Sequence, residues 1–262
     1  MRILFLGDIV GETGREAVRF SLPSLIKKHH PDFVIANGEN ASHGKGLTEN
    51  HYNAIIASGV DAITLGNHYR SKEQIDDYID DVDYLIRPLN VKHYPHGVGS
   101  AVFDVDGIPL RITNLLGQAF LKEEVDVPYE SLLKLIESEE PCIHFVDFHA
   151  ESTSEKEILG YCFDGKVSAI VGTHTHVQTN DAKILPHGTA YLSDVGMCGA
   201  DDGVIGFNKE SVINKIVFGR TGPFSIDVKA PAQINAVVID FDEGSYEATN
   251  IELVNLKEGG NK

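Results

Sequence analysis

Five short segments of this chain share one pattern, an apolar run that ends directly in polar residues of the kinds that bind metal ions. The runs span residues 1–6, 33–36, 61–65, 142–148 and 167–171. Short continuous apolar runs are typical of buried strands in sheets that are covered on both faces. In α/β sheets, ligands bind beside the carboxyl ends of the strands. The pattern therefore predicts an α/β fold in which polar side chains gather along one edge.

The segments between these runs predict helices and hairpins. Helices are expected over residues 11–30, 48–59, 129–139 and 155–163, with Thr48 as a cap and Gly59 as a stop of the second. An Asp106-Gly107 pair between two apolar runs is a strong hairpin signal. A second hairpin is expected around residues 186–188, further strands at 84–86, 224–228, 236–241 and 245–253, and a frayed tail at 259–262. This order predicts one domain over residues 1–262, with two internally related halves.

Composition and cysteine content indicate the class of protein. Of the 262 residues, 42% are hydrophobic and 23% are charged, as in an ordinary globular protein. No apolar stretch approaches the roughly 18 residues of a membrane span, and residues 1–8 predict a strand rather than an export signal. Cys142, Cys162 and Cys198 form no Cys-x-x-Cys pair, which argues against a disulfide framework or a cysteine metal site. A cytoplasmic location is the expectation.

The formal net charge of −17 restricts the partners. Binding to a long nucleic acid depends on many lysines and arginines that neutralise phosphates, so it is disfavoured here. A small anionic substrate stays compatible, because bound cations can invert the local field.

His174 and His176 follow the fifth apolar run and are separated by one residue. On extended backbone, two such side chains point to the same side. Imidazole is the commonest borderline-soft metal ligand, so a metal site is one hypothesis. The pair alone does not decide between ligands and structural histidines.

The other runs place similar residues at their ends, and glycine precedes four of the five groups (Gly7, Gly38, Gly66 and Gly172). The candidates are Asp8, Glu39, Asn40, Asn67, His68, His149, His174 and His176. Each has a simpler alternative: a helix cap for Asp8, a first-turn acid for Glu39, turn residues for the asparagines, and hydrogen-bonded structural roles for His68 and His149. Their shared position at strand ends favours a common metal site.

Short blocks around these residues occur in order over nearly the whole chain. They are residues 7–11, 37–41, 66–68, 87–88, 149–151, 153–156, 172–179 and 194–197. These blocks resemble those of the calcineurin-like metallophosphoesterases, and more closely those of the bacterial YmdB family of metal-dependent cyclic nucleotide phosphodiesterases. The resemblance implies a four-layer α/β/β/α sandwich with mixed sheets, and a pair of metal ions.

The same resemblance implies roles for individual residues. One metal would be held by Asp8, Glu39, Asn40 and His176, and the second by Asn67, His149 and His174, with Glu39 bridging. His68 would be the catalytic imidazole. Val10 replaces a histidine of the wider superfamily and Glu39 replaces its bridging aspartate, as in the YmdB subgroup. The first metal then has one imidazole and mostly oxygen ligands, which makes divalent or trivalent iron or manganese plausible and zinc less certain.

Two cations held roughly 3.5–4 Å apart lower the pKa of a bridging water and hold phosphate oxygens. The resulting hydroxide would attack phosphorus in line, with His68 stabilising or protonating the leaving oxygen. The hypothesis is hydrolysis of small phosphodiesters, and the family resemblance suggests 2′,3′-cyclic nucleotides such as 2′,3′-cAMP.

Three alternatives stay open at this point. A phosphomonoesterase could use the same scaffold, and a regulatory protein could bind metal with little turnover. An amidohydrolase also uses His-x-His, but there the pair closes the first strand of a barrel, whereas here it comes late. A homo-oligomer is left open as well.

Overall fold

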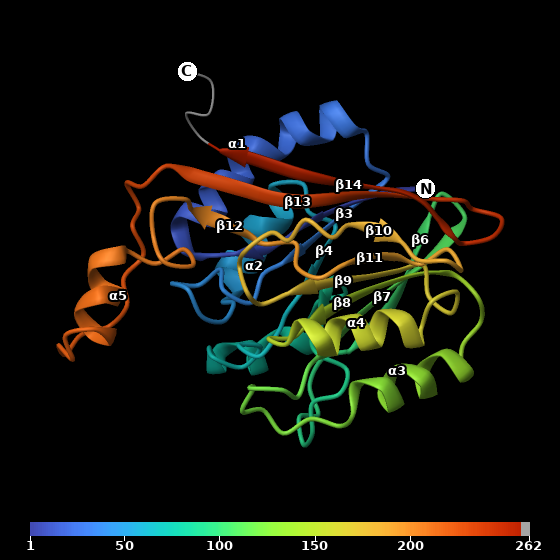
Figure 1. The fold of residues 1–262 in the computed structure, drawn as a ribbon, viewed down its shortest axis with the longest axis horizontal. Coiled ribbons are helices and arrows are strands. Elements are labelled where there is room, and N and C mark those ends of the chain that lie inside the picture. Colours follow the sequence, from blue (N-terminus) through green and yellow to red (C-terminus); the bar gives the residue numbers. More distant parts are fainter. Residues whose placement is uncertain (258–262) are drawn as a thin grey trace.

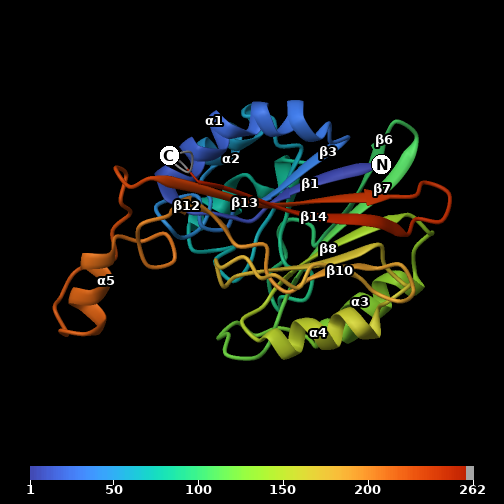
Figure 2. The same ribbon diagram turned by 45° about the horizontal axis from the view of Figure 1, so that its top comes forward.

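The alternating strands and helices of the chain form two mixed β-sheets that stack face to face, with helices on both outer faces (Figure 1, Figure 2). The computed structural model describes residues 1–257. The first sheet contains β1 (Arg2–Leu6), β2 (Asp8–Ile9), β3 (Phe33–Asn37), β4 (Ala62–Thr64), β5 (Leu85–Ile86), β12 (Met197–Ala200), β13 (Ala232–Phe241) and β14 (Ala248–Lys257). The second contains β6 (Ser100–Val105), β7 (Ile108–Leu116), β8 (Ile143–His149), β9 (Ala169–Thr173), β10 (Lys183–Ile184) and β11 (Ala190–Leu192). The helices are α1 (Gly11–His29), α2 (Glu49–Ala57), α3 (Pro128–Glu137), α4 (Thr153–Cys162) and α5 (Lys209–Ile216), with 3-10 turns η1 (Glu73–Asp77) and η2 (Ile79–Asp81).

Parallel strands form one side of the first sheet and the centre of the second, so several strands end at the same edge. The first sheet has the order β2-β12-β13-β1-β3-β4-β5, with β14 on β13, and its strands β1, β3, β4 and β5 are parallel. The second has the order β10-β11-β9-β8-β7-β6, and its strands β7, β8, β9 and β11 are parallel. The β8–β9 register pairs His149 with Thr173. The carboxyl ends that the sequence predicts to carry polar groups are therefore neighbours.

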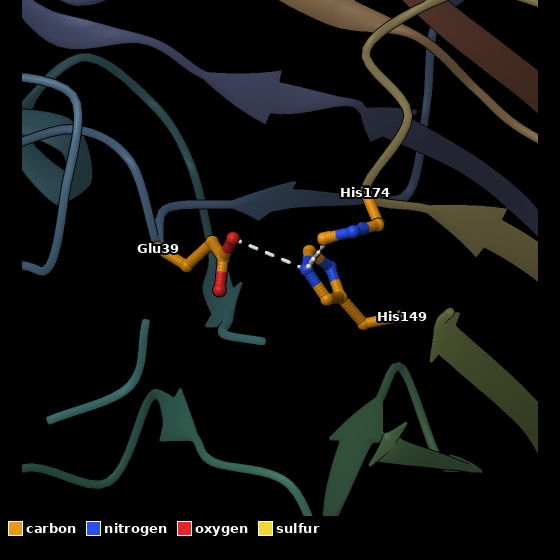
Figure 3. Close-up of side chains that lie close together, drawn as sticks. All are labelled: Glu39, His149 and His174. Carbon is orange, nitrogen blue, oxygen red and sulfur yellow. Dashed lines mark hydrogen bonds and ion pairs between the residues drawn. The ribbon is translucent and has the colours of Figure 1, made fainter. Parts of the chain in front are cut away.

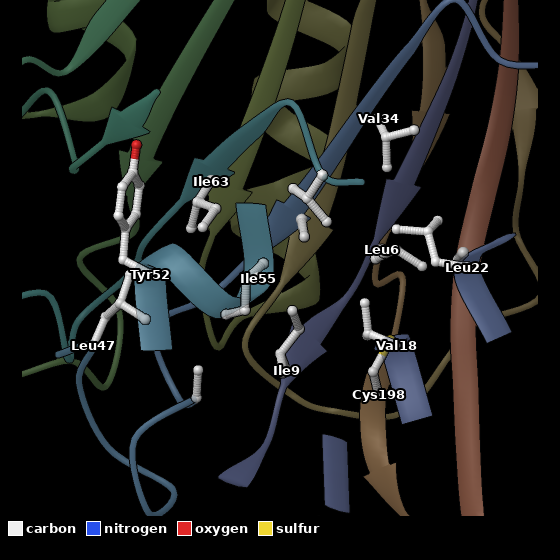
Figure 4. Packing of buried hydrophobic residues seen from close by; sticks show 14 of the residues in the cluster. Leu6, Ile9, Val18, Leu22, Val34, Leu47, Tyr52, Ile55, Ile63 and Cys198 are labelled. Atoms are coloured by element: carbon white, nitrogen blue, oxygen red, sulfur yellow. The ribbon is translucent and has the colours of Figure 1, made fainter. Parts of the chain in front are cut away.

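Three apolar layers hold the elements together. Alternate residues of β1 point to opposite faces, so Leu4 and Leu6 pack with α1 and α2, whereas Ile3 and Phe5 face the second sheet. Figure 4 shows Leu6 in this layer together with Leu22 and Ile55. Phe5 meets Phe145 of β8 edge to face, with ring centroids 5.0 Å apart. A third cluster packs α3 and α4 on the outer face of the second sheet. The predicted four-layer α/β/β/α sandwich is confirmed.

Most predicted elements are present, including the hairpin at Asp106-Gly107, where both residues have positive φ. The strand predicted at 224–228 is wrong: in this segment only Ile226 forms an isolated bridge, to Phe207. Its apolar residues Phe224 and Val228 are exposed because no neighbouring strand covers them. The predicted tail at 259–262 lies outside the described residues.

The short strands β2 and β12 and helix α5 are not among the predicted elements. Helix α5 projects from the side of the layers and buries none of its residues (Figure 1, Figure 2), although its apolar residues Val212, Ile213 and Ile216 have helical spacing. Its N-terminus is capped by Asn208, whose side chain accepts a hydrogen bond from the backbone N–H of Ser211. Within residues 1–257, no helix combines the length and apolar character that a membrane crossing requires.

Candidate metal centre

The strand ends place the seven side chains predicted as metal ligands in one connected group. Asp8 begins β2, Glu39 and Asn40 follow β3, Asn67 follows β4, His149 ends β8, and His174 and His176 follow β9. Each touches at least one other member of the group. Asp8 is not a helix cap, since Val10 occupies that position of α1, and Glu39 lies in a turn rather than in a helix.

The Glu39 carboxylate lies between the two sides of this group. Its Oε1 atom is 3.2 Å from Nδ2 of Asn40 and 3.1 Å from Nε2 of His149. Its Oε2 atom accepts the backbone N–H of His68 at 2.7 Å. The Glu39 side chain thus contacts both sides, and the backbone N–H of His174 also donates to Oδ2 of Asp8 at 3.2 Å.

On one side of Glu39, the Asn40 amide lies between the side chains of Asp8 and His176. Its Nδ2 atom is 3.3 Å from Oδ1 of Asp8 and 3.1 Å from Nε2 of His176. A half turn of the amide would present its oxygen to the same place. The other ring nitrogen of His176 donates to the carbonyl of Ile205 at 2.9 Å, so in the neutral ring the lone pair is on the Nε2 atom that faces Asp8.

On the other side, three acceptors surround Nε2 of His149, two of which, from Glu39 and His174, are drawn in Figure 3. They are Oε1 of Glu39 at 3.1 Å, Oδ1 of Asn67 at 3.0 Å and Nδ1 of His174 at 3.0 Å. His174 places its Nε2 atom 3.0 Å from a carboxylate oxygen of Glu151, an acceptor that directs the ring proton there and leaves Nδ1 bare. The ligand atoms of Glu39, His149 and His174 all lie within 4.8 Å of one another.

Burial sets the protonation of these groups. It lowers the pKa of His149 and of His174 to about 4, so both rings are neutral at pH 7 and keep the lone pair that a metal requires. The contact of His149 with Glu39 is therefore not an ion pair at that pH. Burial also raises the pKa of Asp8, because the charged carboxylate loses its hydration inside the protein, an effect that His176 and His149 offset only in part. These donors fit a bound cation, which would offset the buried negative charge.

Gly66 leaves room for the group. A Cβ atom at this position would overlap Oε2 of Glu39 and the ring of His149. Gly172 lies within β9, where a Cβ atom would overlap the carbonyl oxygen of Ser193. Both glycines serve close approach, and neither has the positive φ of a sharp turn.

The predicted extended backbone at His174 and His176 is wrong. The two residues have φ values of 100° and 66°, and they lie in a loop after β9. The loop is fixed at both ends: Lys156 Nζ donates to the carbonyl of Thr173, and Thr175 N–H donates to Asp194 Oδ2. Left-handed backbone, rather than strand alternation, brings both imidazoles to the group.

His68 reaches the group through its backbone. Its N–H donates to Glu39, while its ring Nδ1 lies 3.2 Å from the hydroxyl oxygen of Ser71. Burial lowers its pKa, which favours the neutral ring at pH 7. His68 therefore contacts Glu39 through its backbone, and its ring contacts Ser71.

The sequence interpretation assigned no role to several residues that support the group. Asp147 and Thr173 lie behind His149, and Lys156 and Asp194 form a buried ion pair beside the His174 loop. Asp147 had a detectable signal, because an acid in an otherwise apolar strand must have partners when buried. Lys156, Thr173 and Asp194 lie in the blocks 153–156, 172–179 and 194–197 that resemble the family, but a block by itself does not say which residues contact one another.

Comparisons with known proteins find similar sequences over nearly the whole chain. A family model described as "YmdB-like protein" matches residues 4–254. A Bacillus subtilis protein named 2′,3′-cyclic-nucleotide 2′-phosphodiesterase is 46% identical over 257 residues, covering 97% of this chain and 96% of the relative.

Two solved structures share the fold over nearly the full length of both chains. A crystal structure described as a novel phosphatase of Mycoplasma pneumoniae has a TM-score of 0.93 and 39% identity, covering 98% of this chain and 93% of that one. A hypothetical protein from Thermus thermophilus has a TM-score of 0.91 and 36% identity, covering 98% of this chain and 99% of that one. By the family match and these identities, the chain belongs to the YmdB-like family.

Proposed function

We propose that this protein is a metal-dependent phosphodiesterase that hydrolyses small phosphodiesters, with 2′,3′-cyclic nucleotides as the first candidates. The observation that carries the proposal is the convergence of Glu39 Oε1, Asn67 Oδ1 and His174 Nδ1 around His149 Nε2. Three hydrogen-free acceptors around one ring nitrogen are an arrangement that a cation stabilises.

We assign two metal positions to the group. Asp8, Asn40 and His176 would hold one ion; Asn67, His149 and His174 would hold the other; and Glu39 would be shared. The contacts of Glu39 with both Asn40 and His149 support the shared position. One imidazole and several oxygen donors at the first position favour iron or manganese.

Bound metal ions would supply positive charge for the phosphate oxygens and a more acidic water as nucleophile. The chain itself supplies placement and a proton. The His68 backbone is held to Glu39, which keeps the imidazole beside the group, and its neutral ring retains one N–H at pH 7. We assign to this N–H a hydrogen bond to the leaving oxygen, where negative charge develops.

The size of the substrate is inferred from charge and from the relative. A net charge of −17 repels a long polyanion, so a mononucleotide is a better candidate than a nucleic acid. The Bacillus subtilis relative is named for 2′,3′-cyclic nucleotides.

A cytoplasmic location is also proposed, supported by the free state of Cys142, Cys162 and Cys198.

A phosphomonoesterase is the second candidate, because the Mycoplasma pneumoniae structure is described as a phosphatase. The test compares the purified protein, loaded with iron or manganese, on bis-p-nitrophenyl phosphate, 2′,3′-cAMP and p-nitrophenyl phosphate. Faster cleavage of the two diesters supports the proposal, and chromatography of 2′-AMP against 3′-AMP identifies the ester bond that breaks. Inertness toward both diesters would overturn it.

A further inference from the structure

Asp147 is a fully buried carboxylate behind the metal centre, and it joins the two sheets. Its Oδ2 atom accepts hydrogen bonds from Asn37 Nδ2 at 3.0 Å and Thr64 Oγ1 at 2.5 Å, both from the first sheet. Its Oδ1 atom accepts a hydrogen bond from the hydroxyl of Thr173 at 2.7 Å. Asp147 therefore has a donor at each oxygen.

The Thr173 hydroxyl connects this carboxylate to His149. Its Oγ1 atom is 2.8 Å from Nδ1 of His149. A threonine hydroxyl has one proton, and here that proton is directed to Asp147. The oxygen must then accept from His149, so the ring proton is on Nδ1 and the Nε2 atom is bare.

This direction is that of the carboxylate form of Asp147, in which both oxygens can only accept. The donors from Asn37, Thr64 and Thr173 all point to these two oxygens. With Asp147 in this form, the ring proton of His149 is on Nδ1.

We propose that Asp147 is a positioning residue that acts through Thr173 to hold the proton of His149 on Nδ1, so that the Nε2 lone pair faces Glu39, Asn67 and His174. The bare Nε2 atom then joins the ligand atoms of Glu39, Asn67 and His174 as a fourth atom with a free lone pair for the metal. The consequence for metal affinity depends on the proposed function; the position of the proton does not. Partners behind a histidine ligand fix its tautomer and orientation in many metal sites.

Asp147→Asn is the direct test, because the amide has the shape of the carboxylate and reverses the direction of the hydrogen bond with Thr173. The amide oxygen would accept from both Asn37 and Thr64, and the amide nitrogen would then donate to Thr173. The Thr173 hydroxyl would turn toward His149 Nδ1, which moves the ring proton to Nε2, into the metal site. We expect Mn²⁺ to bind about 10–100-fold more weakly, as followed by the EPR signal of free Mn²⁺.

Long-range ¹H–¹⁵N spectra of the full chain, labelled at histidine and recorded before Mn²⁺ is added, report the tautomer directly. The signal of His149 is assigned by its loss in His149→Gln. We expect an Nδ1-protonated ring in the parent and an Nε2-protonated ring in Asp147→Asn. A purely structural role of Asp147 would lower stability and leave the tautomer and the relative Mn²⁺ affinity unchanged.

Thr173 offers a matched pair of variants. Thr173→Ser keeps the hydroxyl and should keep the tautomer and the Mn²⁺ affinity of the parent. Thr173→Val keeps the shape without the hydroxyl, so Mn²⁺ binding should weaken as in Asp147→Asn. This pair decides the matter if Asp147→Asn does not fold.

The failures of the two proposals are distinguishable. A parent chain that binds no Mn²⁺ or iron would overturn the proposed function, and the spectra would still decide the tautomer. A parent that binds Mn²⁺ no more tightly than both Asp147→Asn and Thr173→Val would overturn the role of Asp147. So would an Nδ1-protonated His149 in Asp147→Asn.

Discussion

The Nζ atom of Lys156 lies 2.8 Å from Oδ2 of Asp194, and both side chains are only 2% exposed. The same ammonium donates to the carbonyl of Thr173 at 2.9 Å, and the same Oδ2 atom accepts the N–H of Thr175 at 3.0 Å. The ion pair therefore contacts the residues directly before and after His174, Thr173 and Thr175. It stabilises the left-handed loop that directs the two imidazoles.

Lys156→Met should destabilise the fold and loosen this loop. The substitution leaves the Asp194 charge buried without its partner, which costs about 3–5 kcal/mol in comparable sites. We expect a loss of that size in the free energy of unfolding, measured by urea denaturation, together with weaker Mn²⁺ binding. Lys209→Met is the matched control, because its exposed pair with Asp202 has the same 2.8 Å distance and should contribute less than about 1 kcal/mol. Equal losses in the two variants would contradict the argument.

Glu39→Gln should remove metal from the protein. One carboxylate oxygen becomes an amide group with two hydrogens, and the negative charge shared between the two proposed positions is lost. We expect metal affinity to fall by more than about tenfold and metal content after dialysis to fall with it, as measured by elemental analysis. Glu16→Gln, at an exposed pair with Arg19 on α1, controls for charge and should retain the metal. Unchanged metal content in Glu39→Gln counts against the shared position.

Much of the sandwich was predictable from the sequence, because buried strands are short apolar runs and polar residues follow directly at their ends. Asp8, Glu39, Asn67 and His149 each follow or end an apolar run, and parallel strands bring such ends to one edge. The position of the polar residues therefore predicted the centre without side-chain geometry. The functional interpretation went further only through resemblance to a family.

The rest depended on long-range contacts. The loop in which His174 and His176 have positive φ is contacted at Thr173 and Thr175 by the Lys156–Asp194 pair, whose members are 38 residues apart in sequence. Strand β12 pairs with β2 and β13, so its four residues owe their conformation to partners that are distant in the chain. Local composition contains neither relationship.

Gly66→Ala should disturb the centre without changing any donor. A Cβ atom at this position would lie 2.5 Å from Cδ2 of His149, and it would also overlap Glu39. Overpacking of this kind typically costs about 1–3 kcal/mol, and we expect the Mn²⁺ affinity to fall as His149 is displaced. At Gly244 a Cβ atom would lie 3.4 Å from Asp242 Oδ1, an ordinary contact, so Gly244→Ala is the control. Calorimetry and Mn²⁺ titration of both variants check the prediction, and it fails if Gly66→Ala behaves like the control.

The buried His144 should make stability depend on pH. Burial, together with the nearby Arg111, lowers the pKa of His144 to about 3, whereas the unfolded chain binds this proton below about 6.5. Stability is therefore fully present above pH 6.5 and is lost as the pH falls toward 3, by up to about 1.4 kcal/mol per pH unit.

His144→Gln removes this titration and keeps a polar group near Thr113, whose hydroxyl oxygen lies 2.8 Å from Nε2 of His144. The slope of unfolding free energy against pH between 6 and 4, measured with EDTA present, should be shallower in the variant by up to about 1.4 kcal/mol per pH unit. Parallel slopes would show that His144 does not titrate differently in the folded and unfolded chains.

The contact between Phe5 and Phe145 tests whether residues 1–262 form one domain. The two rings come from different sheets and meet at 5.0 Å within the apolar layer between them. Because this layer is shared, we expect both sheets to unfold together in one transition. Phe5→Ala should lower the free energy of unfolding by about 3–5 kcal/mol, and amides of β3 and β8 should lose protection from hydrogen exchange to the same extent. Phe20→Ala removes an exposed ring from α1 and should change little. Two separate transitions, or exchange that accelerates in the first sheet alone, would show that each sheet belongs to its own domain.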